Sequence, residues 1–213
     1  NWFCDDTWRF DDFTSKVCWL FDVCSTTKRE CIKKYKDIGY KNVFLTNWHA
    51  NENLYSEPSC IKEVEVSFVG GLHGQRKSYI DYLSSKGIKV NNPRNCSFEE
   101  MLWEYKRSKI CLNFSRCSVG KENQMKARLF EVVASNSVLV TERCPDLENF
   151  FTEDQEAIFF SNPGELHQKL NFLLQRGEHL NKISDAGYNR YMRDHTSKIR
   201  LRNVLSKIEE TIS

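Results

Sequence analysis

Residues 126–142, KARLFEVVASNSVLVTE, join a helix-like segment to a strand-like segment with almost nothing between them. Lys126 and Arg128 stand just ahead of the apolar run, and Glu131 lies inside it. Charged side chains are rarely buried without a partner, so two cations and a carboxylate here need a reason beyond packing. The stretch predicts one helix–strand unit of an α/β fold, with charged groups at the start of the helix.

The same alternation of strands and helices runs from about residue 61 to the end of the chain. Val64, Val66 and Phe68 alternate with polar residues ahead of a Gly70–Gly71 turn. Further strands are expected at 88–90, 110–115, 138–141 and 157–160. Helices are expected at 76–85 and behind a capping box of Ser97 and Glu100. From a cap at Asn162 to Ile212 the chain is expected to be helical, with breaks near Gly177 and at 195–196. This order indicates a mainly parallel sheet with helices on both faces. Right-handed crossovers then place the carboxyl ends of the strands along one edge, where such folds bind ligands.

Residues 1–60 show half of another α/β unit. WFCDD, VCWLFDVCST and NVFLTNW read as strands, and RECIKKYKDIGY reads as a helix between the last two. The chain begins with Asn1 rather than Met. We therefore expect residues 1–60 to be the truncated end of a first Rossmann-like domain, and residues 61–213 to form a second Rossmann-like domain with C-terminal helices.

Composition excludes several classes of protein. The 213 residues are 40% hydrophobic and 28% charged, as in ordinary globular proteins. No apolar run approaches the roughly 20 residues of a membrane span, so none is expected. A net charge of +2 is too small to indicate nucleic-acid binding. The basic stretches KRECIKKYK and SKIRLR have helical spacings that are typical of solvated faces, so nucleic acid is not an expected partner.

The nine cysteines are odd in number and form no C-x-x-C pair. Cys18, Cys24 and Cys111 lie in apolar runs, where a free thiol behaves as a small hydrophobe. This pattern favours reduced thiols and a cytoplasmic location, and leaves a disulfide framework or a zinc site as the alternative.

Two helix starts are candidate phosphate sites. In VGGLHGQRK, residues 69–77, glycines let the chain turn before a helix that opens with Arg76, and His73 lies in the turn. The unpaired backbone N–H groups of a helix start suit phosphate. The segment is neither G-x-G-x-x-G nor a Walker loop, so an ordinary strand-to-helix turn is the alternative.

The second helix start carries Lys126 and Arg128. If both helices follow neighbouring parallel strands, their starts converge, and Arg76, Lys126 and Arg128 are placed to hold a diphosphate. Glu131, one turn further along, is placed to accept hydrogen bonds from a ribose diol. The alternative is a local Arg128–Glu131 ion pair, worth about 0–1 kcal/mol at a surface.

Five blocks in order resemble one known family: YKRSKICLNFS, QMKARLFEVVASNSVLVTE, LENFFTEDQEAIFF, NPGELHQKLNFLL and AGYNRYMRDHT. They are similar to the C-terminal domain of CgeB-like (spore maturation protein type) glycosyltransferases, of the GT-B superfamily and the glycosyl transferases group 1 type. The resemblance covers residues 63 to about 210. NWFCDDTWRFDDF and TTKRECIKKYKDIGYKNVFLTNWHAN also resemble the end of that family's first, acceptor-side domain.

The resemblance implies a transferase that moves a sugar from a UDP, GDP or similar donor to the hydroxyl of an unknown acceptor. If the roles of the family's residues are carried over to the matching positions, the residues that bind the diphosphate are Gly70, Gly71, His73, Arg76, Lys126 and Arg128. The residue that binds the ribose is then Glu131. Asn123 stands where related enzymes often have a second acid, and Asn136 and Asp154 stand where the family usually has glycine.

The acceptor side is less well marked. Asp5 and Asp6 close a strand and are the candidate general bases for an acceptor hydroxyl, with solvated or helix-capping aspartates as the alternative. No D-x-D sequence occurs, so we expect no metal and no cofactor, and cationic side chains to stabilise the leaving group. The competing hypothesis is a noncatalytic module that retains the fold and binds a nucleotide or a protein.

Overall fold

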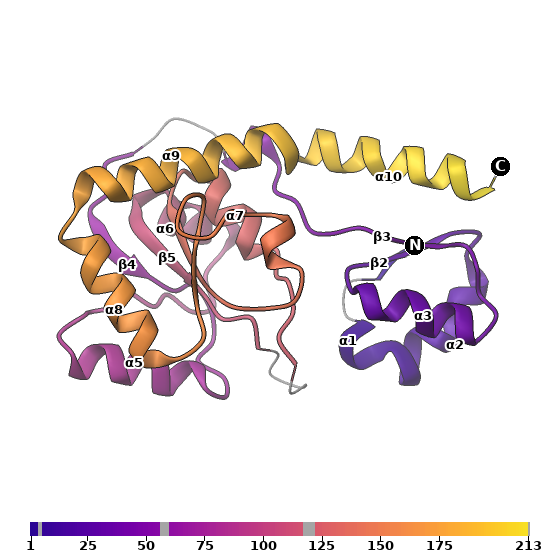
Figure 1. Ribbon diagram of the computed structural model, residues 1–213, viewed down its shortest axis with the longest axis horizontal. Coiled ribbons are helices and arrows are strands. Elements are labelled where there is room, and N and C mark those ends of the chain that lie inside the picture. The colour runs from indigo at the N-terminus through magenta and orange to yellow at the C-terminus, as the bar shows by residue number, and fades with distance from the viewer. Residues whose placement is uncertain (4–5, 56–59, 117–121, 213) are drawn as a thin grey trace.

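The computed structural model describes residues 1–3, 6–55, 60–116 and 122–212. Two separate parallel sheets organise it, one of three strands in the order β1-β2-β3 and one of four in the order β4-β5-β6-β7. Figure 1 shows them in two lobes at opposite ends of the long axis. The first lobe is built on β1–β3 and the second on β4–β7.

The sheet of the second lobe is buried on both faces. Its strands are β4 (Val64–Ser67), β5 (Ser108–Asn113), β6 (Val138–Glu142) and β7 (Ile158–Phe160). Cys111, Leu139 and Phe159 belong to one hydrophobic cluster, and the alternate residues of the same strands belong to another. Because neighbouring residues of a strand point to opposite faces, near-continuous apolar strands are what two covered faces require.

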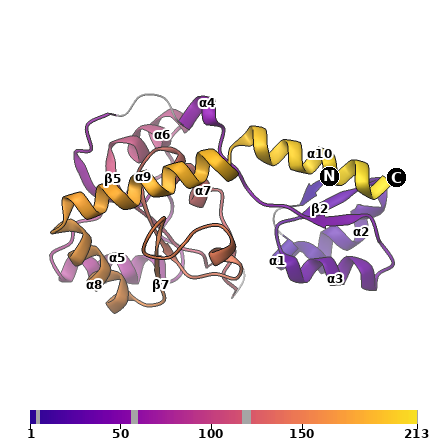
Figure 2. The same ribbon diagram turned by 45° about the horizontal axis from the view of Figure 1, so that its top comes forward.

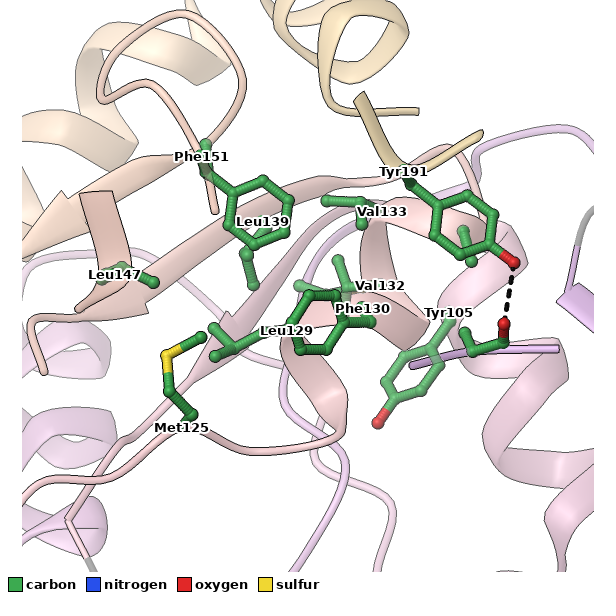
Figure 3. Close-up of a cluster of buried hydrophobic side chains, with 14 of the residues drawn as sticks. Tyr105, Met125, Leu129, Phe130, Val132, Val133, Leu139, Leu147, Phe151 and Tyr191 are labelled. Carbon is green, nitrogen blue, oxygen red and sulfur yellow. Dashed lines mark hydrogen bonds between the residues drawn. The ribbon is translucent and has the colours of Figure 1, made fainter. Parts of the chain in front are cut away.

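Different helices cover the two faces. On the first face lie α6 (Phe98–Arg107) and α7 (Arg128–Ala134), whose side chains pack with the end of α9 (Gly177–Asp194). Figure 3 shows this cluster, with Phe130 and Val133 of α7 between Leu139 of β6 and Tyr191 of α9. The second face is covered by α5 (Arg76–Ser85), α8 (Pro163–Leu174) and the first half of α9.

Local signals set the helix ends as expected. Ser97 and Glu100 form a reciprocal capping box at the start of α6, and the Asn162 side chain caps α8 with Pro163 in its first turn. The chain from Asn162 is helical with the two predicted breaks, into α8, α9 and α10 (Ser197–Ile212). After α7, Asn136 adopts φ 51°, and Asp154 adopts φ 61°. Both are left-handed conformations that favour glycine and that asparagine and aspartate tolerate.

Asp6, expected to close the first strand, instead begins a helix, so the first lobe differs from its sequence prediction in two places. Its strands are β1 (Trp2–Phe3), β2 (Cys24–Thr26) and β3 (Val43–Leu45), and its helical segments are α1 (Asp6–Arg9), η1 (Phe10–Thr14), α2 (Ser15–Val17), η2 (Cys18–Leu20) and α3 (Arg29–Asp37). The strand predicted over residues 17–26 is therefore wrong for its first half. Trp19 and Leu20 remain exposed, so that apolar run is not a buried strand.

The short strand predicted at 88–90 is also wrong. The chain leaves α5 through Gly87 at φ 84° and touches the sheet at one isolated bridge, Ser67 to Asn91. Ile88 is buried in the cluster on the α5 face, so its apolar character serves packing rather than strand pairing.

The lobes meet where residues 46–51 and α4 (Glu52–Tyr55) pass the junction of α9 and α10. Ala50 bridges Thr196, and its carbonyl accepts hydrogen bonds from the Tyr191 hydroxyl at 3.1 Å and the Ser197 amide at 3.0 Å. Figures 1 and 2 show α10 continuing from α9 toward the first lobe. Within the described ranges, none of the helices has both the length and the apolar character needed to cross a bilayer.

Candidate functional site

Arg128 joins three elements at the carboxyl edge of the second sheet. Its Nη2 donates to the Val69 carbonyl at 2.6 Å, just beyond β4, and its Nη1 donates to Oδ1 of Asn113, the last residue of β5, at 3.3 Å. Its Nε donates to the Tyr105 hydroxyl on α6 at 3.2 Å. The guanidinium is thus held in a defined position and does not swing freely.

The glycine turn after β4 makes room for this side chain. Gly70 adopts φ 130°, and a Cβ there would lie 3.2 Å from Arg128 Nη2. A residue other than glycine would be strained at this φ and would also crowd the guanidinium. At Gly71, a Cβ would collide with the ring of the exposed His73.

Arg76 lies beside Arg128. Its Nη1 donates to the Gly71 carbonyl at 3.2 Å, and its Nη2 donates to the Arg116 carbonyl beyond β5 at 3.3 Å. The guanidinium carbons of Arg76 and Arg128 lie 5.8 and 5.0 Å from the centre of the same Phe68 ring. The structure therefore brings two of the three predicted cations to one edge of the sheet, around the glycine turn.

The third cation, Lys126, is half-buried directly ahead of α7. Its carbonyl accepts from the Leu129 amide at 3.2 Å, which places Lys126 in the turn that starts the helix. Its charge opposes the rise that burial causes in the pKa of Cys144.

Glu131, in the first turn of α7, is bound by a tyrosine. The Tyr55 hydroxyl donates to Oε1 of Glu131 at 3.1 Å. Burial raises the pKa of Glu131, while the charge of Arg128 and the Tyr55 hydrogen bond act against that rise. The Arg128–Glu131 ion pair is not formed between these two described residues, since the guanidinium donates to Val69, Asn113 and Tyr105 instead.

Asp6 has the surroundings of a structural carboxylate. It is 1% exposed, and it accepts from the Thr14 hydroxyl at 2.8 Å and from the Tyr35 hydroxyl at 3.0 Å. These bonds tie α1 to the end of η1 and to α3. Asp5, the other candidate general base, lies outside the described residues.

Asn123 has a backbone partner where the resemblance suggests an acid. Its Nδ2 donates to the Arg143 carbonyl at 2.7 Å, and its backbone bridges Arg116. Glu142, which sequence reasoning missed, accepts from the Arg116 amide at 3.2 Å and so supports the same loop. Its position as the last residue of β6, at the carboxyl edge of the sheet, is the signal that marks it.

A cleft of about 340 Å³ between the lobes was also missed. It is lined by Lys28, Glu30, Cys31, Lys34, Glu122, Asn123 and Pro145. Lys28 pairs with Glu122 across it, and Arg29 Nε lies 3.2 Å from Asp146 Oδ1. Lys28 follows the end of β2, and Asn123 and Pro145 lie in the loops that follow β5 and β6, so strand ends of both sheets face each other here. Sequence alone did not show that they meet.

The described residues hold no group of three or more His, Cys, Asp or Glu side chains suited to a metal ion. Seven of the cysteines lie within the described ranges, and each is a free thiol.

Comparison with known proteins identifies the relatives of this fold. A family model described as glycosyl transferase-like matches residues 59–206. No curated protein sequence matches the chain significantly.

Several solved structures are similar. A glycosyltransferase from Rickettsia africae has a TM-score of 0.69 and 11% identity, covering 90% of this chain and 64% of that one. HepE from Anabaena, in complex with UDP and glucose, has a TM-score of 0.70 and 8% identity, covering 88% and 63%. The C-terminal domain of LpcC, a glycosyl transferase group 1 family protein from Francisella tularensis, has a TM-score of 0.55 and 11% identity, covering 70% and 99%.

These similarities confirm the predicted α/β fold class, with parallel sheets flanked by helices as in GT-B C-terminal domains. At such low identities they show the fold alone. The chain spans less than two thirds of the Rickettsia and Anabaena chains.

Proposed function

The chain belongs to the glycosyl transferase-like family, and we propose that its second lobe binds the nucleoside diphosphate part of a nucleotide-sugar donor. The parent enzyme transfers the sugar to the hydroxyl of an acceptor. The observation that carries this proposal is the pair of guanidinium groups, Arg76 and Arg128, against the Phe68 ring and around the Gly70–Gly71 turn.

Arg128 keeps donors for an anion. A guanidinium has five N–H groups, and to the described residues Arg128 donates three hydrogen bonds, to Val69, Asn113 and Tyr105. The two remaining N–H groups are held in place by those bonds, so an oxygen of the diphosphate binds without a large ordering cost. We assign Arg76, Lys126, His73 and the backbone of the glycine turn to the same diphosphate.

Glu131 is the proposed ribose-binding group. It lies on the helix that carries Arg128, one turn further along, and its carboxylate accepts from a hydroxyl donor, Tyr55. A carboxylate in such a setting is suited to accept from ribose hydroxyls as well. UDP is the first nucleotide to test, because the structure of HepE contains UDP and glucose.

For the chemical step, the cationic groups would stabilise the departing diphosphate without a metal ion. Residues 1–60 are proposed to be the C-terminal part of the acceptor-side domain, and residues 61–213 the donor domain. The CgeB-like subfamily and the cytoplasmic location stay predictions from the sequence, as do Asp5 and Asp6 as general bases. The cleft lined by Lys28 and Asn123 is the proposed meeting place of donor and acceptor.

A noncatalytic nucleotide-binding module is the second candidate. The Asn123 amide, which donates to the Arg143 carbonyl, cannot act as a carboxylate near the sugar. Transfer or hydrolysis of the donor by a longer form of the protein separates the two functions. Binding without either reaction would favour the module.

Calorimetry with UDP and GDP tests the donor site. Replacing Arg128 by alanine should weaken binding of whichever nucleotide binds by about ten- to a hundredfold, the range of a hydrogen bond to a charged group. Arg107→Ala is the matched control, because Arg107 is a half-buried, paired arginine at the opposite end of β5.

Because Arg128 also holds the loops together, Arg76→Ala serves as a second variant. Thermal melting identifies a variant that has lost its fold. Unchanged affinity in both folded variants would show that the two guanidinium groups do not bind the diphosphate.

A further inference from the structure

The Glu131 carboxylate depends on a residue from a distant part of the chain. Among the described residues, Tyr55 is the one side chain that hydrogen-bonds to it, from 76 positions away in the sequence. Tyr55 ends α4, which lies in the segment connecting the two sheets. The bond therefore links the connection between the lobes to the first turn of α7.

We propose that Tyr55 is a positioning residue for Glu131, an inference that rests on the proposed function. Its hydroxyl holds Oε1 of the carboxylate and so orients the group to accept from the ribose hydroxyls of a nucleoside diphosphate through its remaining lone pairs. Ligand-binding groups need such supporting contacts, because a loosely held side chain must be ordered when the ligand binds, and this cost lowers the affinity.

Tyr55 is itself firmly held. Its side chain is buried, and its ring packs edge-on against Phe98 of α6, with centroids 5.9 Å apart. Its backbone amide donates to the Asn51 carbonyl at 3.1 Å. The phenol therefore has little freedom to leave Glu131 without movement of α4. Burial also raises the pKa of Tyr55, so the hydroxyl keeps its proton and remains a donor.

The electrostatic setting gives this role a measurable signature. Among the described residues, the charged and titratable groups that act on Glu131 are Arg128 on its own helix, Tyr55 on α4 and Tyr105 on α6. Burial favours the protonated acid, whereas Arg128 and the Tyr55 hydroxyl favour the carboxylate. Removing the hydroxyl should raise the pKa of Glu131 further, and protonation then removes the negative charge that strengthens hydrogen bonds from the ribose hydroxyls.

The test compares Tyr55→Phe with Tyr191→Phe by calorimetry with UDP from pH 5 to 8. Tyr191, labelled in Figure 3, is the matched control, because its buried hydroxyl donates to the Ala50 carbonyl of the same connecting segment, whereas the Tyr55 hydroxyl donates to Glu131. We expect Tyr55→Phe to weaken UDP binding roughly three- to tenfold at neutral pH, the effect of one hydrogen bond. The fall in affinity at acid pH should also begin at a higher pH than in the wild type.

Glu131→Gln separates this inference from the proposed function. If UDP affinity is lower than that of the wild type in both Glu131→Gln and Tyr55→Phe, but not in Tyr191→Phe, the positioning role is supported. If Glu131→Gln weakens binding and Tyr55→Phe leaves affinity and pH profile unchanged, the positioning role is overturned and the donor site stands. If Glu131→Gln leaves nucleotide binding unchanged, both the ribose assignment and this inference are overturned. A wild type that binds neither UDP nor GDP overturns the proposed function itself.

Discussion

His195, the residue that follows α9, is a buried histidine among aromatic side chains. The rings of Phe130, Phe150 and Phe151 lie 5.2 to 5.7 Å from its ring. Its Nε2 donates to the Phe150 carbonyl at 3.1 Å, and its Nδ1 accepts from Arg200 at 3.4 Å. Burial lowers the pKa of His195 to about 4, and the nearby charge of Arg200 acts in the same direction. The residue is neutral in the folded protein at neutral pH.

This histidine should make stability depend on pH. An unfolded histidine has a pKa near 6.5, so on acidification the unfolded chain takes up the proton first. The stability that the neutral histidine contributes is therefore complete above about pH 6.5 and falls as the pH drops toward 4, by up to about 3 kcal/mol. Urea unfolding at several pH values measures this fall.

The change in the free energy of unfolding with pH, between pH 6.5 and 4, should be smaller in His195→Gln than in the wild type, because glutamine does not titrate. His179→Gln, on the half-exposed surface of α9, is the control and should keep the wild-type slope. Equal slopes in the wild type and His195→Gln would contradict this account.

At the scale of elements, α6 connects helix capping to the candidate site. Its start is capped by Ser97 and Glu100, and Tyr105, near its end, accepts from Arg128. Tyr105 is also part of the cluster in Figure 3. Fraying of α6 would therefore disturb the position of the Arg128 guanidinium, which we propose to bind phosphate.

Ser97→Ala should lower the free energy of unfolding by about 1 kcal/mol, since the Glu100 amide loses the side chain that satisfies it. Urea denaturation measures the change. Ser85→Ala is the matched control, because Ser85 is an exposed serine in the last turn of α5 and caps no helix start. We expect the control to stay within about 0.5 kcal/mol of the wild type. Equal losses in the two variants would rule out a specific role for the capping box.

At the scale of the whole molecule, the two lobes are joined in two different ways. Neutral hydrogen bonds and the Ala50–Thr196 bridge join them at the α9–α10 junction. Across the cleft they are joined by ion pairs, Lys28 with Glu122 and Arg29 with Asp146. Partly exposed ion pairs are worth about 0–1 kcal/mol each and weaken in salt. The cleft side should therefore open more easily than the junction.

We expect 1 M NaCl to increase the radius of gyration of the wild type in small-angle scattering, because salt screens the pairs across the cleft. The variant Lys28→Gln/Arg29→Gln should already be open at low salt and change little. Lys33→Gln/Lys36→Gln removes the same charge from exposed positions of α3 outside the cleft lining, where Lys33 pairs with Asp37 within the first lobe. This control should respond to salt as the wild type does. A cleft held by other contacts would make all three proteins respond alike.

Much of the fold follows from local signals. The capping box at Ser97, the cap at Asn162 and the strand runs around 110–115 and 138–141 depend on residues that are neighbours in the chain. Such signals also predicted that the loops after β4 and β5 share one edge, which is where Arg76 and Arg128 meet. Asn136 and Asp154, which stand where the resembling family usually has glycine, both adopt left-handed conformations.

Apart from the strands predicted at 17–20 and 88–90, the sequence by itself determined the order of strands and helices and the edge at which Arg76 and Arg128 lie, because parallel βα units have one handedness. Only the tertiary structure decided that the apolar run at 17–20 is helical, that Tyr55 holds Glu131, and that Lys28 faces Asn123 across a cleft. The physical reason is that periodicity records which face of an element is apolar, whereas a contact between distant residues depends on how separately formed elements pack.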